Sequence, residues 1–192
     1  FNAVKEQTEE EHEKGHAVVS SVGNIFETAW QIRGMEEFLM DLYFNPDWAE
    51  CLLERIMEIR LTVAPLIAKA GVDVVHFSDD VGTQHGMMMD PKIWRKFIKK
   101  RHKKMFASVK SVNPDIFISY HSDGDISAII PELIEMGLDI LNPVQPECLD
   151  PEWVKNEFGQ DLTLWGTVGI QGLLPFGTPE EVREKIKSNI EN

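Results

Sequence analysis

The sequence of 192 residues has only two cysteines and no long apolar run. Cys51 and Cys148 show no CxxC spacing and cannot form a disulfide framework, so we predict a protein of the reducing cytoplasm. No segment approaches the ~20 apolar residues of a membrane-spanning helix. The start, FNAVKEQTEEEHEKGH, is polar and acidic, unlike a signal peptide. Because the first residue is Phe rather than Met, we expect the gene product to start earlier.

Basic residues are scarce relative to acidic ones. The chain has 19 Lys and Arg against 32 Asp and Glu, which gives a net charge of -13 and a pI of about 4.8. Nucleic-acid binding needs a basic face, so we predict no nucleic-acid partner. The one basic run, KKRHKK (99–104), is expected to be a solvated helix face. An anionic small substrate stays compatible with this charge if a local basic pocket exists.

Glycine-rich phosphate motifs are also missing. Neither GxGxxG nor GxxxxGK[ST] follows any expected strand, so dinucleotide and P-loop sites are unsupported. Strand-like and helix-like segments instead alternate about five times without a hairpin signal, which is typical of parallel βαβ units. The expected strands cover residues 17–23, 72–80, 115–124, 138–145 and 161–169, the fourth of them breaking at Pro143.

Helices are expected between and around these strands. They cover residues 24–34, with Asn24 as N-cap, and 35–46, 47–70, 91–112, 127–137, 150–159 and 178–192. Such an α/β pattern fits either an open doubly wound sheet or a closed barrel. Most strands end in a polar loop, as in FSDDVGTQ and YHSDGD, and a barrel brings all these ends to one face.

The prediction is therefore a (β/α)8 TIM barrel, of which residues 1–192 form one incomplete domain. A full barrel takes about 250 residues, and about five βα units leave two unpaired strand edges. We expect either a fragment or completion by another copy of the chain, and hence a possible homodimer.

The first candidate site is FSDDVGTQHG (77–86). Two carboxylates at a strand end can bind a cation or hold a proton, and Gln84 can both donate and accept hydrogen bonds. Because successive strand residues face opposite sides, Asp79 and Asp80 are not both expected to point into the site. The alternative is that one of the two carboxylates caps a turn through backbone hydrogen bonds.

The second candidate site is YHSDGDI (120–126). His121, Asp123 and Asp125 alternate along an extended chain and would share one face. They could ligate a divalent metal, or a carboxylate could set the tautomer of His121 for proton transfer. The alternative is that Ser122 or Asp123 caps the next helix and His121 packs on the core.

The third candidate site is LNPVQPE (141–147), where Asn142 and Gln145 could orient a polar substrate. The alternative is a turn bracketed by prolines. Together the three segments give predicted catalytic residues Asp80, His121 and Asp123. The predicted substrate-binding residues are Asp79, Gln84, Asn142 and Gln145.

Four stretches resemble the uroporphyrinogen decarboxylase superfamily, which includes zinc-dependent methyltransferases serving corrinoid proteins. They are VVSSVGNIFETAWQIRG, GVDVVHFSDDVGTQ, SYHSDGDISAIIPELIEMGLDILNPVQPE and LTLWGTVGIQGLLPFGTPEEVREKI. The resemblance implies a complete (β/α) barrel, with this chain matching its middle and later strands. Several decarboxylase residues would then lie outside this chain: the Arg that binds the substrate carboxylate, a central Asp and a C-terminal His.

The resemblance also implies two chemistries. The decarboxylase uses no metal or cofactor, whereas the methyltransferases activate a thiol with zinc held by a His-x-Cys-Gly segment. His121 matches that His, while Asp123 stands at the position of the Cys, so a mixed zinc site with His121 and Asp123 as ligands is predicted.

Methyl transfer between a small methylated compound and a corrinoid protein is therefore our first functional prediction. Uroporphyrinogen decarboxylation in porphyrin biosynthesis, a lyase reaction, is the second. A non-catalytic tetrapyrrole- or corrinoid-binding protein is the third.

Overall fold

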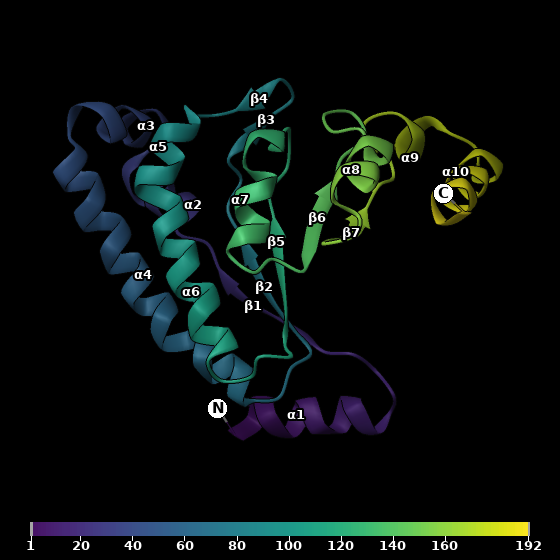
Figure 1. Cartoon of the computed structure of the whole chain (residues 1–192), viewed down its shortest axis with the longest axis horizontal. Helices are drawn as coiled ribbons and strands as arrows, with labels where there is room; N and C mark the ends of the chain where they lie inside the picture. The colour runs from purple at the N-terminus through teal and green to yellow at the C-terminus, as the bar shows by residue number, and fades with distance from the viewer. Residues whose placement is uncertain (1, 192) are drawn as a thin grey trace.

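The structure is a computed structural model, and it describes residues 2–191. Its centre is a parallel five-stranded sheet in the order β1-β2-β5-β6-β7 (Figure 1). The strands are β1 (Val19–Gly23), β2 (Val74–Ser78), β5 (Phe117–His121), β6 (Ile140–Val144) and β7 (Thr163–Gly166). A small antiparallel pair, β3 (Gly82–Thr83) and β4 (Gly86–Met87), follows β2.

The order of the strands in the sheet is the order in which the chain makes them. Every crossover therefore adds the next strand on the same side, as in a barrel, whereas a doubly wound sheet reverses its order at a switch point. Within the described residues, β1 and β7 each pair with one neighbour and form the two edges of the sheet. The prediction of a barrel-type α/β fold with about five units is confirmed.

Helices occupy the segments between the strands and both ends of the chain (Figure 1). The α-helices are α1 (Asn2–Glu13), α2 (Phe26–Arg33), α3 (Met35–Phe44), α4 (Pro46–Lys69), α5 (Pro91–Trp94), α6 (Lys100–Lys110), α7 (Ile130–Glu135), α8 (Pro151–Phe158), α9 (Leu173–Phe176) and α10 (Pro179–Glu191). A π-helical turn, η1 (Arg95–Lys99), joins α5 to α6, and a short 3-10 turn, η2 (Ser127–Ile129), precedes α7. No helix within residues 2–191 is long and apolar enough to cross a membrane.

The core lies between one face of the sheet and the long helices α4 and α6. Side chains alternate along each strand, so Phe77 and Tyr120 point into this core and are fully buried. Their neighbours His76, Ser119 and His121 point to the opposite face, which is the inner face of a barrel. These histidine and serine side chains of the strands therefore lie on the face away from the helices.

Two predicted local features differ from the structure. Asn24 was expected to cap the helix that follows β1, but α2 begins at Phe26 without any cap from its own N-cap side chain. Pro143 was expected to break its strand, but β6 continues to Val144 with a cis bond between Asn142 and Pro143. The helix expected over 178–192 begins with a capping box, because Thr178 and Glu181 exchange hydrogen bonds at the start of α10.

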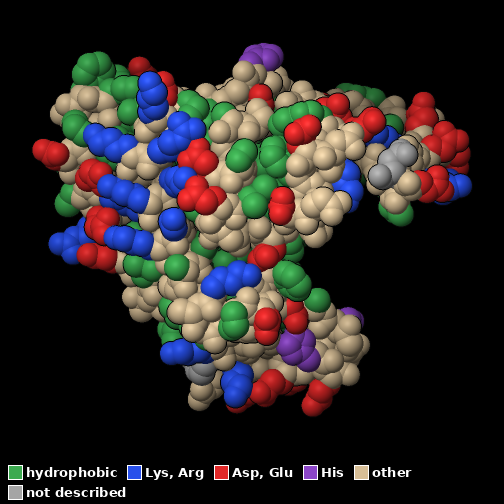
Figure 2. All heavy atoms as spheres, viewed as in Figure 1, with side chains coloured by type: hydrophobic (Ala, Val, Ile, Leu, Met, Phe, Trp, Pro, Cys, Tyr) green, Lys and Arg blue, Asp and Glu red, His purple; other side chains and the backbone are tan. Residues whose placement is uncertain are grey.

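The basic run 99–104 is only partly the solvated face that was predicted. Arg101 and His102 are buried, at 1% and 0% exposure. The lysines of the run pair with glutamates of α4 and α7, and Figure 2 shows blue and red side chains interleaved over this surface. The run is therefore a surface on which lysines and glutamates pair, with two buried members.

Candidate functional site

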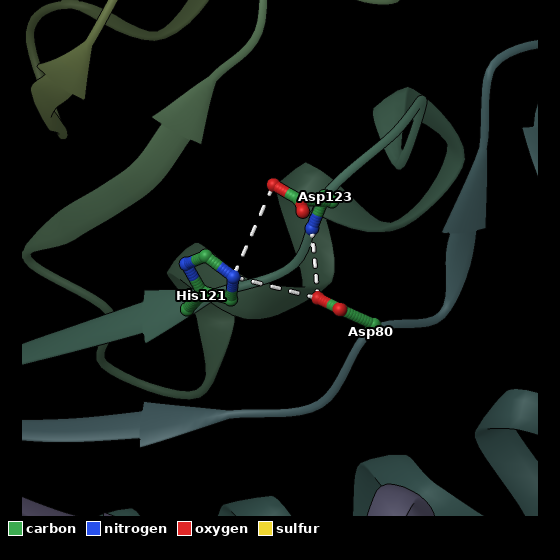
Figure 3. A group of neighbouring side chains, drawn as sticks. All are labelled: Asp80, His121 and Asp123. Carbon is green, nitrogen blue, oxygen red and sulfur yellow. Dashed lines mark hydrogen bonds and ion pairs between the residues drawn. The ribbon is translucent and has the colours of Figure 1, made fainter. Parts of the chain in front are cut away.

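Asp80, His121 and Asp123 meet at the carboxyl ends of β2 and β5 (Figure 3). The register places Ser78 beside His121, so the first residues beyond each strand also become neighbours. His121 Nε2 lies 3.5 Å from Asp80 Oδ1 and 3.9 Å from Asp123 Oδ1. One ligand atom from each residue falls within 4.8 Å of the others, and this is the one such group among residues 2–191.

The two aspartates that follow β2 point in opposite directions, as the strand period predicted. Asp80 faces the site, where its Oδ1 accepts the backbone N–H of Asp123 at 2.9 Å. Asp79 is fully buried on the helix side. Its carboxylate accepts the backbone N–H groups of Ile25, Phe26 and Glu27 at the start of α2.

Asp79 thus fits the capping alternative rather than the predicted substrate-binding role. The capped element is a helix far away in sequence, not the local turn we had considered. Asp125 also lies apart from the site, because its Oδ1 accepts the N–H of Ser127 at the start of η2. The alternation that put Asp125 beside His121 and Asp123 ends where the chain turns after β5.

Two glycines bring the loops after β2 and β5 into direct backbone contact. Gly124 has a φ of 81°, and a Cβ there would lie 2.6 Å from the carbonyl carbon of Gly82 and the carbonyl oxygen of Thr83. A Cβ on Gly82 would lie 2.5 Å from the carbonyl oxygen of Asp123. Only glycine fits both positions without a shift of the backbone. This close approach lets Asp80 and Asp123 share one site.

His121 is held in one orientation by Asn142 of β6. The Asn142 side-chain N–H group donates to the backbone carbonyl of Trp165 at 3.4 Å, so its oxygen faces His121. His121 Nδ1 therefore donates to Asn142 Oδ1, at 2.7 Å, and its Nε2 carries the free lone pair. That lone pair points toward the two carboxylates (Figure 3).

The two predicted glutamines support loops around the site. Gln145 is 6% exposed, and its Oε1 accepts the N–H of Gly124 at 3.3 Å. Gln84 is exposed and donates to Gln171 Oε1 at 2.7 Å, which joins the loop after β2 to the loop after β7. Both residues lie at the predicted end of the sheet, and their contacts are with the protein rather than with the Asp80–His121–Asp123 group.

Three further residues belong to the site although sequence reasoning missed them. His76 on β2 packs edge-on against His121 and against Trp165, each with 6.1 Å between ring centres. Burial, followed by the nearby His121, lowers the pKa of His76. Its place could have been read from VDVVHFS, because His76 and Ser78 share the strand face opposite Phe77. Glu27 carried no such signal, since a helix start remote in sequence places it.

The site is rich in negative charge. Burial, and then the charges of Asp80 and Asp79, raise the pKa of Glu27 above its ordinary value. Among the ion pairs of residues 2–191, none joins Asp80 or Asp123 to a Lys or Arg. The arrangement therefore suits a cation better than an anion.

The donor set fits a divalent metal. Ligands bound tetrahedrally to zinc at 2.0–2.1 Å lie roughly 3.4 Å from one another. The 3.5 Å and 3.9 Å separations need only small side-chain movements to reach that arrangement. A ligating imidazole usually donates its second N–H to a carbonyl or carboxylate, and Asn142 already accepts that bond from His121.

Comparison with known proteins identifies the family to which the chain belongs. Residues 2–192 match the family described as Uroporphyrinogen decarboxylase (URO-D). The chain belongs to the uroporphyrinogen decarboxylase family. The resemblance seen in the sequence is thus confirmed over nearly the full chain.

Two curated relatives of this family member are methanogen methyltransferases. The methylated-thiol–coenzyme M methyltransferase of Methanosarcina mazei is 22% identical over 168 residues, which are 86% of this chain and 42% of the relative. The methylcobamide:CoM methyltransferase MtaA of Methanosarcina barkeri is 26% identical over 145 residues, which are 76% of this chain and 40% of the relative. The chain spans about two fifths of the length of these curated relatives.

A solved structure confirms the fold of this family member. A methyltransferase from Methanosarcina mazei superposes with a TM-score of 0.77 at 21% identity. The superposition covers 98% of this chain and 54% of the solved one. Nearly all of the present structure is therefore found within a longer member of the fold.

Proposed function

We propose that the protein containing this chain transfers a methyl group between a small methylated compound and a corrinoid protein. Asp80, His121 and Asp123 would hold a divalent cation for this reaction, with zinc the first choice. The observation that carries the proposal is the orientation of His121, whose Nε2 lone pair points at two carboxylates. Both curated relatives are methyltransferases, which supports the same reaction class.

A bound zinc would act as a Lewis acid that keeps a thiol deprotonated near neutral pH. The residues of this chain then have separate tasks. His121 and the two aspartates bind the cation, and Asn142 fixes the tautomer of His121. His76 and Trp165 supply aromatic rings on the inner face of the sheet beside His121.

Uroporphyrinogen decarboxylation is the second candidate, because the matching family carries that name. Its substrate bears several carboxylates and needs basic binding groups. Asp80, Asp123 and Glu27 gather at this site, and no Lys or Arg among residues 2–191 pairs with the two aspartates. The charge of the site therefore favours methyl transfer over decarboxylation.

Metal analysis tests the proposal directly. The protein purified after zinc loading should carry about one zinc per chain, and His121→Ala should lose it. His16→Ala is the matched control, since His16 is an exposed histidine of the N-terminal segment whose ring pairs with Glu11. Retention of zinc by His121→Ala would remove His121 from the site. An unmodified protein that binds no zinc but converts uroporphyrinogen in the presence of a chelator would overturn methyl transfer.

A further inference from the structure

Beneath the site lies the buried, hydrogen-bonded pair Asp79–His102, which the proposed reaction does not use. Asp79 and His102 are both fully buried, and Asp79 Oδ2 lies 2.7 Å from His102 Nε2. His102 Nδ1 has no hydrogen-bond partner, so Nε2 is the nitrogen that carries the donated proton. The ring also packs edge-on against Phe77, Phe106 and Tyr120. The His102 ring is therefore held by three aromatic side chains and by the carboxylate of Asp79.

The hydrogen bonds of Asp79 connect four elements of the fold. Its carboxylate accepts hydrogen bonds from backbone N–H groups at the start of α2 and from the side chain of His102 on α6. Its backbone carbonyl accepts the hydroxyl of Tyr120 at 3.1 Å, and its backbone N–H donates to the carbonyl of His121 at 3.0 Å. The residue thus ties the end of β2 to the end of β5 and to two helices.

Three parts of this buried network, namely Asp79, Tyr120 and the first turn of α2, adjoin residues of the site. Asp80 follows Asp79, His121 follows Tyr120, and Glu27 stands in the first turn of the helix that Asp79 caps. A helix cap alone needs only one carboxylate oxygen. Here both oxygens are bonded: Oδ1 accepts N–H groups at the start of α2, and Oδ2 is held by His102 at 2.7 Å and more weakly by the N–H of Ile25 at 3.2 Å. The bond to His102 thus restricts rotation of the carboxylate, and with it the direction of the adjacent Asp80.

The π-helical turn η1 precedes the helix that supplies His102. The buried residues that follow it recur in steps of four, which places His102 and Phe106 together against the sheet. Burying a histidine without a partner is costly, and Asp79 is the partner that this position supplies.

We propose that Asp79 and His102 are positioning residues that set Asp80 against His121 in the candidate metal site. For its metal-binding readout, this inference rests on the proposed function. A second readout does not depend on a metal: the backbone N–H of Asp123 donates to Asp80 Oδ1, so its exchange with solvent reports where Asp80 lies.

The test compares three variants with unmodified protein. Asp79→Asn and His102→Leu should weaken Co²⁺ binding about tenfold, as loss of an outer hydrogen bond to a metal site does, and change the visible spectrum of the bound cobalt. Both should also speed exchange of the Asp123 amide in metal-free protein. His102→Gln keeps an N–H donor and should restore both properties toward the unmodified values.

Arg101→Lys is the matched control, because Arg101 is the adjacent buried cation of α6 but pairs with Glu50 and Glu54 instead. It should lower thermal stability without changing the Asp123 amide or the cobalt spectrum. Unchanged Asp123 exchange in His102→Leu, or an equal change in Arg101→Lys, would refute the positioning role. If no protein binds cobalt, the proposed metal function fails, and the Asp123 amide alone decides the positioning role.

Discussion

Replacing Asp79 by Ala should be among the most destabilising single changes in this chain. Three backbone N–H groups at the start of α2 would lose their acceptor, and loss of such a cap costs about 1–2 kcal/mol. His102 would keep a buried N–H without a partner, which costs about 1–3 kcal/mol more. We expect the free energy of unfolding to fall by about 2–5 kcal/mol, which is the sum of these two losses.

Urea denaturation followed by circular dichroism measures this change. Asp150→Ala is the control, because Asp150 caps α8 through a single N–H, that of Glu152, at an exposed position. That variant should lose only about 1 kcal/mol. If Asp79→Ala costs no more than Asp150→Ala, then burial and the bond to His102 add nothing to the cap, and our reasoning about Asp79 is wrong.

Three further predictions concern the site. Gly124→Ala should lower the free energy of unfolding by about 2 kcal/mol or more and weaken Co²⁺ binding in a titration, since its Cβ would lie 2.6 Å from the backbone of β3. Gly137→Ala is the control, because Gly137 shares the positive φ but faces open space, and it should leave Co²⁺ binding unchanged. Asn142→Leu should lower zinc affinity about 10- to 100-fold in a competition assay, because His121 loses the acceptor that orients it; unchanged affinity would contradict the tautomer that we assign. In metal-free protein, Glu27 has a pKa raised in the folded state, so its contribution to stability falls as pH rises above the ordinary value of 4.5. Glu27→Gln should therefore gain stability relative to unmodified protein between pH 4 and pH 7 in urea titrations, and a constant difference over that range would count against the raised pKa.

The strands of the sheet and the polar segments at their carboxyl ends were predictable from short-range sequence patterns. A run such as VDVVHFSDD has the apolar residues of a buried parallel strand followed by a polar tip, and all five strands lie where such runs predicted them. His121 and Asp123 were found because alternation along one strand is a local property. The same period of two predicted that Asp79 and Asp80 would point to opposite faces of the sheet.

Contacts between distant segments were not predictable in the same way. The cap of α2 comes from Asp79, which is 54 residues beyond Ile25, so Asn24 was a reasonable but wrong choice. The prediction of one domain over residues 1–192, the cytoplasmic location and the homodimer remain predictions.

Because side chains alternate at the strand ends, Asp79 bonds to the helices in the core, whereas its neighbour Asp80 faces the candidate metal site. Asp123 holds Asp80 through its backbone N–H, while its own side chain is 51% exposed. A different side chain at position 123 can therefore change the ligand set without breaking that bond. We expect Asp123→Cys to give the His-x-Cys pattern and a different metal preference while the buried contacts of Asp79 beneath the site are retained.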